Sequence, residues 1–263
     1  YGEVWIARNR AGRLVALKTV WKSELIGKEL AGLRNYSRIA ESPYLIRIFH
    51  IGETGTILYY TMELADNLGS DELYIPATLG NLLKQKTRFS PAETVRLGEK
   101  LLAGLKTLHQ TGLVHRDIKP ENILYVNGEP KLSDIGLVRS VSQSLSLGGT
   151  LGFIPPERLK SSSGSRSNTD DLYALGKVLY CCLTGNSAED YPSFPPSLLS
   201  DEFSRLNEVI LTACNKNTGL RFQTTEEFQN ALTNGIPRKK RIWTMVFRMR
   251  YWGIGGLTLL IVG

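Results

Sequence analysis

Cysteine and histidine are scarce in this sequence, which has three of each among its 263 residues. Cys181 and Cys182 are adjacent and Cys214 is distant, so the cysteines show neither a disulfide framework nor the paired spacing of a zinc site. His50 and His109 have no partner at the spacing of metal ligands. These absences argue against a disulfide-stabilised domain and a structural metal site. We expect the three thiols to be buried and the two histidines to be packing or surface residues.

Acidic residues are missing from residue 236 onward, although the whole chain has 25 of them. Six basic residues lie in that stretch: Arg238, Lys239, Lys240, Arg241, Arg248 and Arg250. They account for six of the seven excess positive charges. The rest of the chain is therefore nearly neutral, and the basic balance does not indicate a nucleic-acid partner.

The last thirteen residues, 251–263, carry no charge. A helix that spans a bilayer needs about 20 residues, so we expect either the beginning of a transmembrane segment or an anchor on the membrane surface. Basic residues before an apolar run indicate the cytoplasmic side, and Tyr251 and Trp252 suit the membrane interface. We therefore expect a basic juxtamembrane segment over 236–250 and a cytoplasmic body anchored in the inner or plasma membrane. The alternative is a final helix packed on that body.

The composition, with 42% hydrophobic and 22% charged residues, allows a buried core and argues against disorder. Residues 90–93, Ser-Pro-Ala-Glu, form a capping box, and apolar residues then recur at helical spacing as far as Leu108. Two β-rich runs, 44–51 and 56–64, come before this helix. After it, Asn127-Gly128 lies between two more such runs and predicts a hairpin. Strands first and helices later predict an α+β body with two lobes.

Residues 115–122 read His-Arg-Asp-Ile-Lys-Pro-Glu-Asn. Asp117 can accept a hydroxyl proton, Lys119 can neutralise a phosphate, and Asn122 can hold a metal ion, which are the parts that phosphoryl transfer needs on one short loop. The string resembles the catalytic loop of protein kinases.

Other motifs occur in the order that this resemblance requires. Val-Ala-Leu-Lys at 15–18 resembles the strand with the phosphate-anchoring lysine, and Asp-Ile-Gly at 134–136 resembles the family's Asp-Phe-Gly. Pro-Pro-Glu at 155–157 stands in place of Ala-Pro-Glu, residues 171–176 resemble the start of the buried helix under the catalytic loop, and Arg221 resembles the buried partner of Glu157. The resemblance is to the bacterial type of serine/threonine protein kinase, and it covers residues 1–235.

The resemblance implies ATP as the cofactor, with Mg²⁺ or Mn²⁺, and it implies residue roles. Lys18 holds the α- and β-phosphates and pairs with a glutamate, for which Glu24 and Glu29 are the candidates and Glu29 is preferred. Asp117 takes the substrate hydroxyl and Lys119 the transferring phosphoryl, while Asn122 and Asp134 hold the metal ions. The adenine site is implied to consist of Gly2, Val4, Ala16, Met62, Glu63, Ala65 and Leu124, with Met62 as gatekeeper.

The same resemblance divides the chain into a small lobe over residues 1–63 and a large lobe over 64–235. Tyr-Gly-Glu-Val at 1–4 resembles the end of a glycine-rich loop whose first two glycines are absent, so we expect the small lobe to be truncated at its N-terminus. Residues 66–77 are an unusual insertion after the hinge.

Three functions compete for this chain. The first is an active kinase that phosphorylates serine and threonine side chains of proteins, since Lys119 resembles the serine/threonine group, and that autophosphorylates in a transient dimer. The second is a pseudokinase that keeps the fold as a scaffold or nucleotide-binding module. The third is a phosphotransferase for small molecules, which would lack the Pro-Pro-Glu pattern. No catalytic position favours the second or the third.

We predict autophosphorylation on Ser142, Ser144 or Ser146, because Arg116 resembles the residue that binds a phosphate on this segment. Thr150 is expected to hydrogen-bond within the catalytic loop instead. Mass spectrometry of active protein should find phosphate on that serine-rich segment. A phosphate-free segment from 139 to 150 would leave it as a plain solvated loop.

Overall fold

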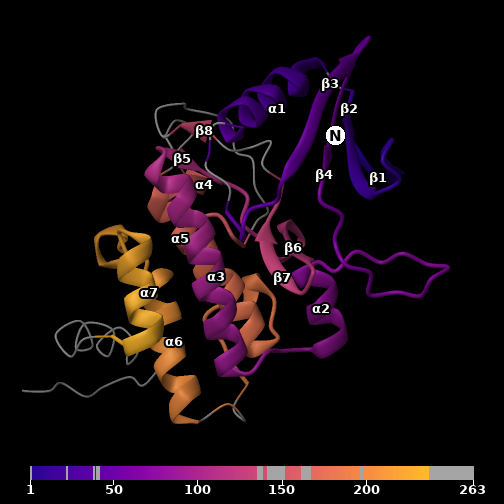
Figure 1. Cartoon of the computed structure of the whole chain (residues 1–263). Coiled ribbons are helices and arrows are strands. Elements are labelled where there is room, and N and C mark those ends of the chain that lie inside the picture. Colours follow the sequence, from indigo (N-terminus) through magenta and orange to yellow (C-terminus); the bar gives the residue numbers. More distant parts are fainter. Residues whose placement is uncertain are drawn as a thin grey trace, which may run out of the picture.

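The computed structural model describes residues 2–21, 23–37, 39, 42–134, 139–140, 152–160, 167–195, 198 and 200–236. A strand-rich small lobe lies above a helix-rich large lobe (Figure 1). The α+β, two-lobed architecture that the sequence predicts is confirmed.

The small lobe is an antiparallel sheet in the order β1-β2-β4-β3. Its strands are β1 (Gly2–Arg8), β2 (Leu14–Val20), β3 (Ile48–Thr54) and β4 (Ile57–Met62). Helix α1 (Ser23–Tyr36) joins β2 to β3 and places Leu33 in the same buried cluster as Val20 and Leu58. The register sets Lys18 directly opposite both Val4 and Tyr60. Residues directly opposite each other share a face of the sheet, so these three side chains lie on one face.

The β-rich run predicted over 44–51 is a strand only from Ile48 onward. Its first residues pair with the large lobe instead: Ile46 N donates to Leu132 O at 2.9 Å, and Leu132 N donates to Tyr44 O at 2.9 Å. Residues 44–46 therefore connect the lobes and do not extend β3, because their backbone groups find hydrogen-bond partners in the large lobe.

The large lobe is built around α3 (Pro91–Gln110) and α5 (Asn168–Thr184). The capping box predicted for α3 is confirmed, since Ser90 N donates to Glu93 Oε2 at 2.9 Å and Glu93 N donates to Ser90 Oγ at 3.3 Å. Every residue of α5 from Asp170 to Thr184 is buried. The other helices are α2 (Leu79–Lys86), α4 (Pro156–Lys160), α6 (Asp201–Ala213) and α7 (Thr225–Asn234), with short 3₁₀ turns at Pro120–Asn122, Ala188–Asp190 and Thr218–Leu220.

Two short antiparallel pairs lie beside α3 (Figure 1). One pairs β5 (Leu113–Val114) with β8 (Arg139–Ser140). The other is the predicted hairpin of β6 (Ile123–Val126) and β7 (Glu129–Leu132), which is confirmed. Asn127 and Gly128 at its turn have φ of 53° and 77°, as a type I′ turn requires.

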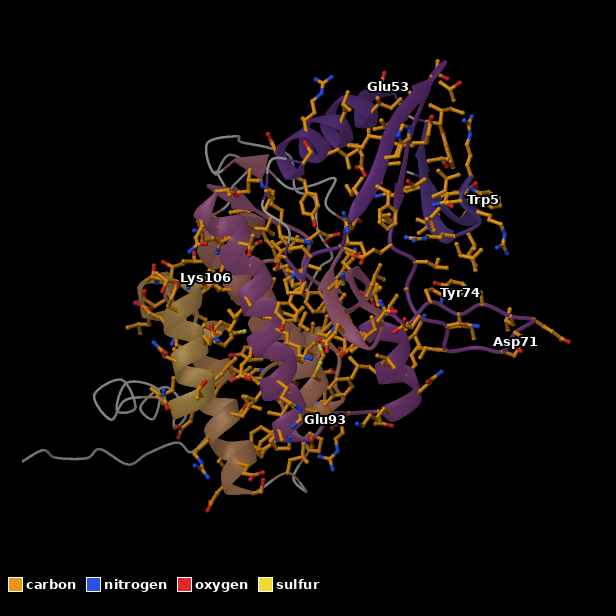
Figure 2. All side chains as sticks on the ribbon, viewed as in Figure 1. Trp5, Glu53, Asp71, Tyr74, Glu93 and Lys106 are labelled. Carbon is orange, nitrogen blue, oxygen red and sulfur yellow. The ribbon has the colours of Figure 1, made fainter. Side chains whose placement is uncertain are left out.

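The insertion over 66–77 is a narrow excursion that leaves the large lobe and returns to it, with Asp71 near its outer end (Figure 2). Asn67 Oδ1 accepts from Gly69 N and Ile75 N, both at 2.9 Å. A Cβ atom on Gly69 would lie 2.0 Å from Leu73 O, so only glycine fits there. The backbone of the insertion therefore has a defined conformation.

Its base fastens the hinge to the β6–β7 hairpin. The Asp66 carboxylate accepts from Asn127 N and Gly128 N at 2.8 Å each, and Tyr74 Oη donates to Ala65 O at 2.8 Å. This gives the insertion the structural role that its sequence does not suggest.

The three cysteines are buried and unpaired by disulfide, as expected. Burial raises the pKa of the Cys181 and Cys214 thiols to about 12, so both are unreactive thiols at neutral pH. Among the residues that the structure describes, no helix is long and apolar enough to cross a membrane. The segment predicted to meet the membrane covers 236–263, and its residues 237–263 lie outside the described ones.

Arg221 is buried and bridges two parts of the large lobe, as predicted. Its Nη1 and Nη2 lie 2.6 and 2.9 Å from the two carboxylate oxygens of Glu157. Nε donates to Asn215 O at 2.7 Å, and the guanidinium lies 4.7 Å from the Tyr173 ring centre. Burial alone would raise the pKa of Glu157, but the bonds from Arg221 hold that pKa below its ordinary value.

We predict that Glu157→Gln flattens the acid side of the stability profile. A carboxylate with a lowered pKa stabilises the fold above its ordinary value of about 4.3, and the stabilisation is lost as the pH falls through the lowered pKa. The melting temperature of the parent protein should therefore fall more steeply below about pH 4 than that of the variant. Glu72→Gln, at an exposed residue of the insertion, should follow the parent. Equal slopes for all three proteins would contradict the assignment.

Candidate active site

The backbone of the catalytic loop is held by one buried carboxylate. Asp171, in the first turn of α5, accepts from His115 N at 2.8 Å and from Arg116 N at 2.9 Å, and its Oδ2 lies 2.9 Å from His109 Nε2. Burial disfavours the charge, but the contacts with His109 and the loop amides hold the pKa of Asp171 below its ordinary value. The helix N-terminus also favours a negative charge there. Asp171 therefore remains ionised and fixes the loop.

The loop needs this support because Arg116 has a φ of 76°, in the left-handed region that non-glycine residues rarely adopt. His109 was expected to pack or to lie on the surface; its side chain is 7% exposed and also hydrogen-bonds to Asp171.

Asp117 and Asn122 lie side by side at the end of this loop, and both are buried. Asn122 Nδ2 donates to Asp117 Oδ2 at 2.7 Å and to Asp117 O at 2.8 Å, while Lys119 Nζ lies 3.1 Å from Asp117 Oδ2. Because Nδ2 is engaged, the amide oxygen of Asn122 is the atom left for a metal ion. The carboxylate of Asp117 is thus held in one orientation by two neighbours.

Asp134 follows the β6–β7 hairpin and is positioned by it. Ser133 N donates to Asn122 O at 2.9 Å and Ser133 Oγ to the same oxygen at 3.0 Å, so Asp134 begins next to Asn122. Asp134 has a φ of 57°. Burial would raise its pKa, but the charge of Lys18 and the hydrogen bond from it hold the pKa of Asp134 below its ordinary value.

Lys18 comes from the other lobe and meets two carboxylates. Its Nζ lies 3.0 Å from Glu29 Oε1 and 2.7 Å from Asp134 Oδ1. Burial by itself would lower the pKa of Lys18, but the negative charges of Asp134 and Glu29 raise it. Of the two glutamate candidates, Glu29 is the one that the structure places on Lys18.

Four of the expected adenine residues lie between the lobes. Ala16 faces Met62 across β2 and β4, and Leu124 on β6 bridges to Thr78. Ala16, Met62 and Ala65 are buried.

Two more of the expected residues lie on strand β1, and both adjoin β2. Val4 is 59% exposed, so its apolar side chain leaves surface uncovered on the face that carries Lys18. Gly2 lies so close to β2 that a Cβ atom would be 2.4 Å from Thr19 O, and a side chain there would have to displace the backbone.

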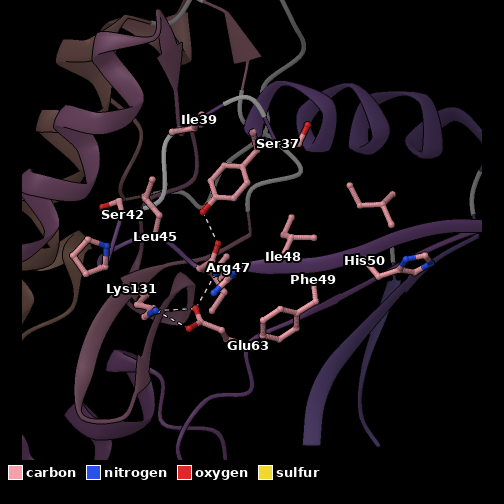
Figure 3. Close-up of a pocket in the computed structure, with 14 residues that line it drawn as sticks. Ser37, Ile39, Ser42, Leu45, Arg47, Ile48, Phe49, His50, Glu63 and Lys131 are labelled. Carbon is pink, nitrogen blue, oxygen red and sulfur yellow. Dashed lines mark hydrogen bonds and ion pairs between the residues drawn. The ribbon is translucent and has the colours of Figure 1, made fainter. Parts of the chain in front are cut away.

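Glu63 uses its side chain for another purpose. Its oxygens lie 2.8 Å from Lys131 Nζ, and Oε2 accepts from Arg47 N at 2.8 Å (Figure 3). These groups line a cavity of about 800 Å³ behind the hinge, together with Phe49 and Ile39. The side chain thus joins the lobes, and only the Glu63 backbone is available to an adenine ring.

The donors between the lobes suit a hard cation that is shared with phosphates. Magnesium ions bind oxygen atoms, often one or two carboxylates together with substrate phosphates, and Asp134 and Asn122 offer one carboxylate and one amide oxygen. Within the described part of the chain, no group of three His, Cys, Asp or Glu side chains could hold a metal alone. Two protein oxygens leave the other positions around such an ion to phosphates and water.

Sequence reasoning missed three contributors to this site. Asp171 was seen only as part of a helix, because acids are common in the first turn of helices and do not by themselves indicate a buried partner. Tyr60 and Lys131 gave no local signal, because their partners are distant in the sequence. The predicted positions Ile135, Gly136, Ser142, Ser144, Ser146 and Thr150 lie outside the described residues.

Comparison with known proteins gives a family match over most of the chain. A model of the protein kinase domain matches residues 1–218. The chain is 34% identical over 209 residues to the serine/threonine-protein kinase PknL of Mycobacterium tuberculosis, covering 75% of the chain and 48% of that protein. It is 28% identical over 220 residues to a probable serine/threonine-protein kinase of Clostridium perfringens, covering 76% and 30%. It is also 29% identical over 219 residues to Aurora kinase B of Danio rerio, covering 80% and 63%. The chain thus spans about half the length, or less, of the bacterial relatives.

We predict that Asp171→Asn loosens the catalytic loop. The amide cannot accept from both loop N–H groups and His109 at once, so one buried donor loses its partner, and the free energy of unfolding should fall by about 3 kcal/mol. Amide hydrogen exchange at His115 and Arg116 should accelerate while that in α3 follows global stability. Asp201→Asn, at an exposed carboxylate, should change stability by less than about 0.5 kcal/mol. Unchanged exchange at His115 and Arg116 would refute the role of Asp171.

Proposed function

The chain belongs to the protein kinase family, and we propose that it transfers the γ-phosphoryl group of ATP to serine and threonine hydroxyls of proteins. One observation carries the proposal: Lys18 on β2, Asp117 and Asn122 on the catalytic loop, and Asp134 after β7 meet between the lobes. Lys18 Nζ is 2.7 Å from Asp134 Oδ1, and Asn122 Nδ2 is 2.7 Å from Asp117 Oδ2. A site with one cation, two carboxylates and an amide suits polyphosphate and metal better than a neutral ligand.

Each charged residue then has one task. Lys18 binds the α- and β-phosphates, and Glu29 keeps it in place. Asp134 and the Asn122 amide oxygen bind Mg²⁺, which neutralises the charge of the phosphates when ATP is present. Asp117 orients the substrate hydroxyl and accepts its proton, and Lys119 stabilises the negative charge on the transferring phosphoryl group.

The adenine ring is proposed to lie between Ala16 and Val4 on one side and Leu124 on the other. Met62 limits the depth of the site, and the backbone groups of Glu63 and Ala65 bind the adenine edge. Gly2 lets the backbone approach the phosphates. Tyr74, which donates to Ala65 O, helps to fix the hinge.

The choice of serine and threonine rests on Lys119 and on the relatives. PknL carries serine/threonine-protein kinase in its name, and Lys119 follows Asp117 at the spacing of that group. The pseudokinase alternative has no support, because no charged catalytic residue is replaced. The proposal also includes protein substrates and autophosphorylation in a transient dimer. It assigns the small lobe to residues 1–63 and the large lobe to residues 64–235.

We also propose attachment to a membrane through the C-terminal residues, with the kinase body on the cytoplasmic side. The support is the order of a basic segment over 236–250 and an apolar run over 251–263. Lys and Arg near anionic headgroups contribute about 1 kcal/mol each.

We predict that Asp134→Ala abolishes phosphoryl transfer in the intact protein and that Asp117→Ala slows it by about 1,000-fold, because the first removes a metal ligand and the second the proton acceptor. Both variants should keep the parent circular dichroism. Asp71→Ala, which removes an exposed carboxylate on the insertion, should retain parental activity. Undiminished transfer from radiolabelled ATP by the Asp134 variant would sink the assignment.

For the membrane proposal, we predict that the intact protein sediments with membranes and that a version ending at Gly235 is soluble and active. Cell fractionation at low salt without detergent checks this. Recovery of the intact protein in the soluble fraction would favour a packed final helix.

A further inference from the structure

Tyr60 has an unusual position for an aromatic residue of the small-lobe sheet. It lies on β4 directly opposite Lys18 on β2, and its side chain is buried. Its hydroxyl lies 2.9 Å from Glu29 Oε1, which is the oxygen that also pairs with Lys18 Nζ at 3.0 Å. The Lys18 ammonium lies 5.6 Å from the centre of the Tyr60 ring. One tyrosine thus contacts both members of the ion pair.

The hydroxyl is the informative part of this side chain. Phenylalanine would fill the same volume, and a buried hydroxyl costs free energy unless it is hydrogen-bonded. The bond to Glu29 satisfies it. Burial raises the pKa of Tyr60, and the nearby charges of Glu29 and Asp134 raise it further against the opposing effect of Lys18. Tyr60 therefore remains neutral and acts as a donor.

Glu29 is attached to the sheet by two groups on two different strands. Lys18 holds it to β2 and Tyr60 holds it to β4. Lys18 has a second partner in Asp134, and both of these residues turn to phosphate or metal when a nucleotide binds in the proposed function. Tyr60 has no such second task, so its bond to Glu29 does not compete with the nucleotide.

We propose that Tyr60 is a positioning residue, which fixes the Glu29 carboxylate and through it holds Lys18 where the nucleotide phosphates arrive. The inference rests on the proposed function only for the role of Lys18. The Tyr60 side chain itself does not touch the substrate, since Glu29 is the residue through which it acts. Its effect must therefore disappear when the Glu29 carboxylate is removed.

A double-mutant cycle tests this dependence. The four proteins are the parent, Tyr60→Phe, Glu29→Ala and the double variant, each as the full chain. Tyr59→Phe is the matched control, because Tyr59 is the preceding residue of β4 and points to the opposite face, where its ring lies 5.9 Å from that of His50. Two readouts are taken: kcat and KM for ATP, and the rate at which an amine-reactive acetyl ester labels Lys18, followed by peptide mass spectrometry.

Tyr60→Phe should lower kcat/KM for ATP about tenfold, which corresponds to about 1.4 kcal/mol, and Tyr59→Phe should leave it unchanged. Labelling of Lys18 should become about threefold faster, which corresponds to about 0.7 kcal/mol, because the Glu29 carboxylate then holds the ammonium group less firmly. In the Glu29→Ala background, Tyr60→Phe should change neither quantity. The labelling readout needs no turnover, so it stands even if the parent shows no phosphoryl transfer.

Three results would overturn the inference. One is a Tyr60→Phe protein whose Lys18 labelling equals that of the parent. Another is a loss of equal size in the presence and absence of the Glu29 carboxylate, which would mean that Tyr60 acts by packing. The third is an equal effect of Tyr59→Phe. An inactive parent with the expected labelling pattern would contradict the proposed function alone.

Discussion

The contact on which the site depends most is the one between the buried carboxylate of Asp171 and the backbone of the catalytic loop. A loop with a left-handed arginine is not stable by itself, and here two of its amides donate to one ionised group. That group stands on α5, which is almost wholly buried, so the packing of the large lobe sets the position of Asp117. The hydrophobic core and the chemistry are thereby connected through a single side chain.

A small number of side-chain and backbone contacts also joins the two lobes. Lys18 reaches across the cleft to Asp134, Lys131 reaches the hinge at Glu63, and the backbone of Ile46 pairs with Leu132. Two of these contacts are ion pairs between partly buried side chains, which are screened less by salt than surface pairs. Contacts from three separate segments thus join the two lobes. The Asp66 carboxylate adds a further support by capping the β6–β7 turn.

Local sequence patterns predicted what depends on local physics. The capping box at Ser90, the Asn127-Gly128 turn and the buried cysteines all follow from rules about neighbouring residues, and the two-lobed α+β body followed from the order of the elements. The resemblance to kinases named Lys18, Asp117 and Asp134, which the fold brings together. Asp171, Tyr60 and the shape of the 66–77 insertion could not be foreseen, since each acts on a partner far away in the chain. Strand β3 began later than predicted because tertiary pairing with Leu132 overrode the β propensity of residues 44–46.

The central claim is that this site transfers phosphate to serine and threonine, and the most direct measurement is phosphoamino-acid analysis of a generic protein acceptor after incubation with the intact protein and γ-labelled ATP. The account predicts label on phosphoserine and phosphothreonine, none on phosphotyrosine, and loss of the label when EDTA removes the divalent cation. Nucleotide binding without any transfer to protein, or transfer that persists in EDTA, would contradict it.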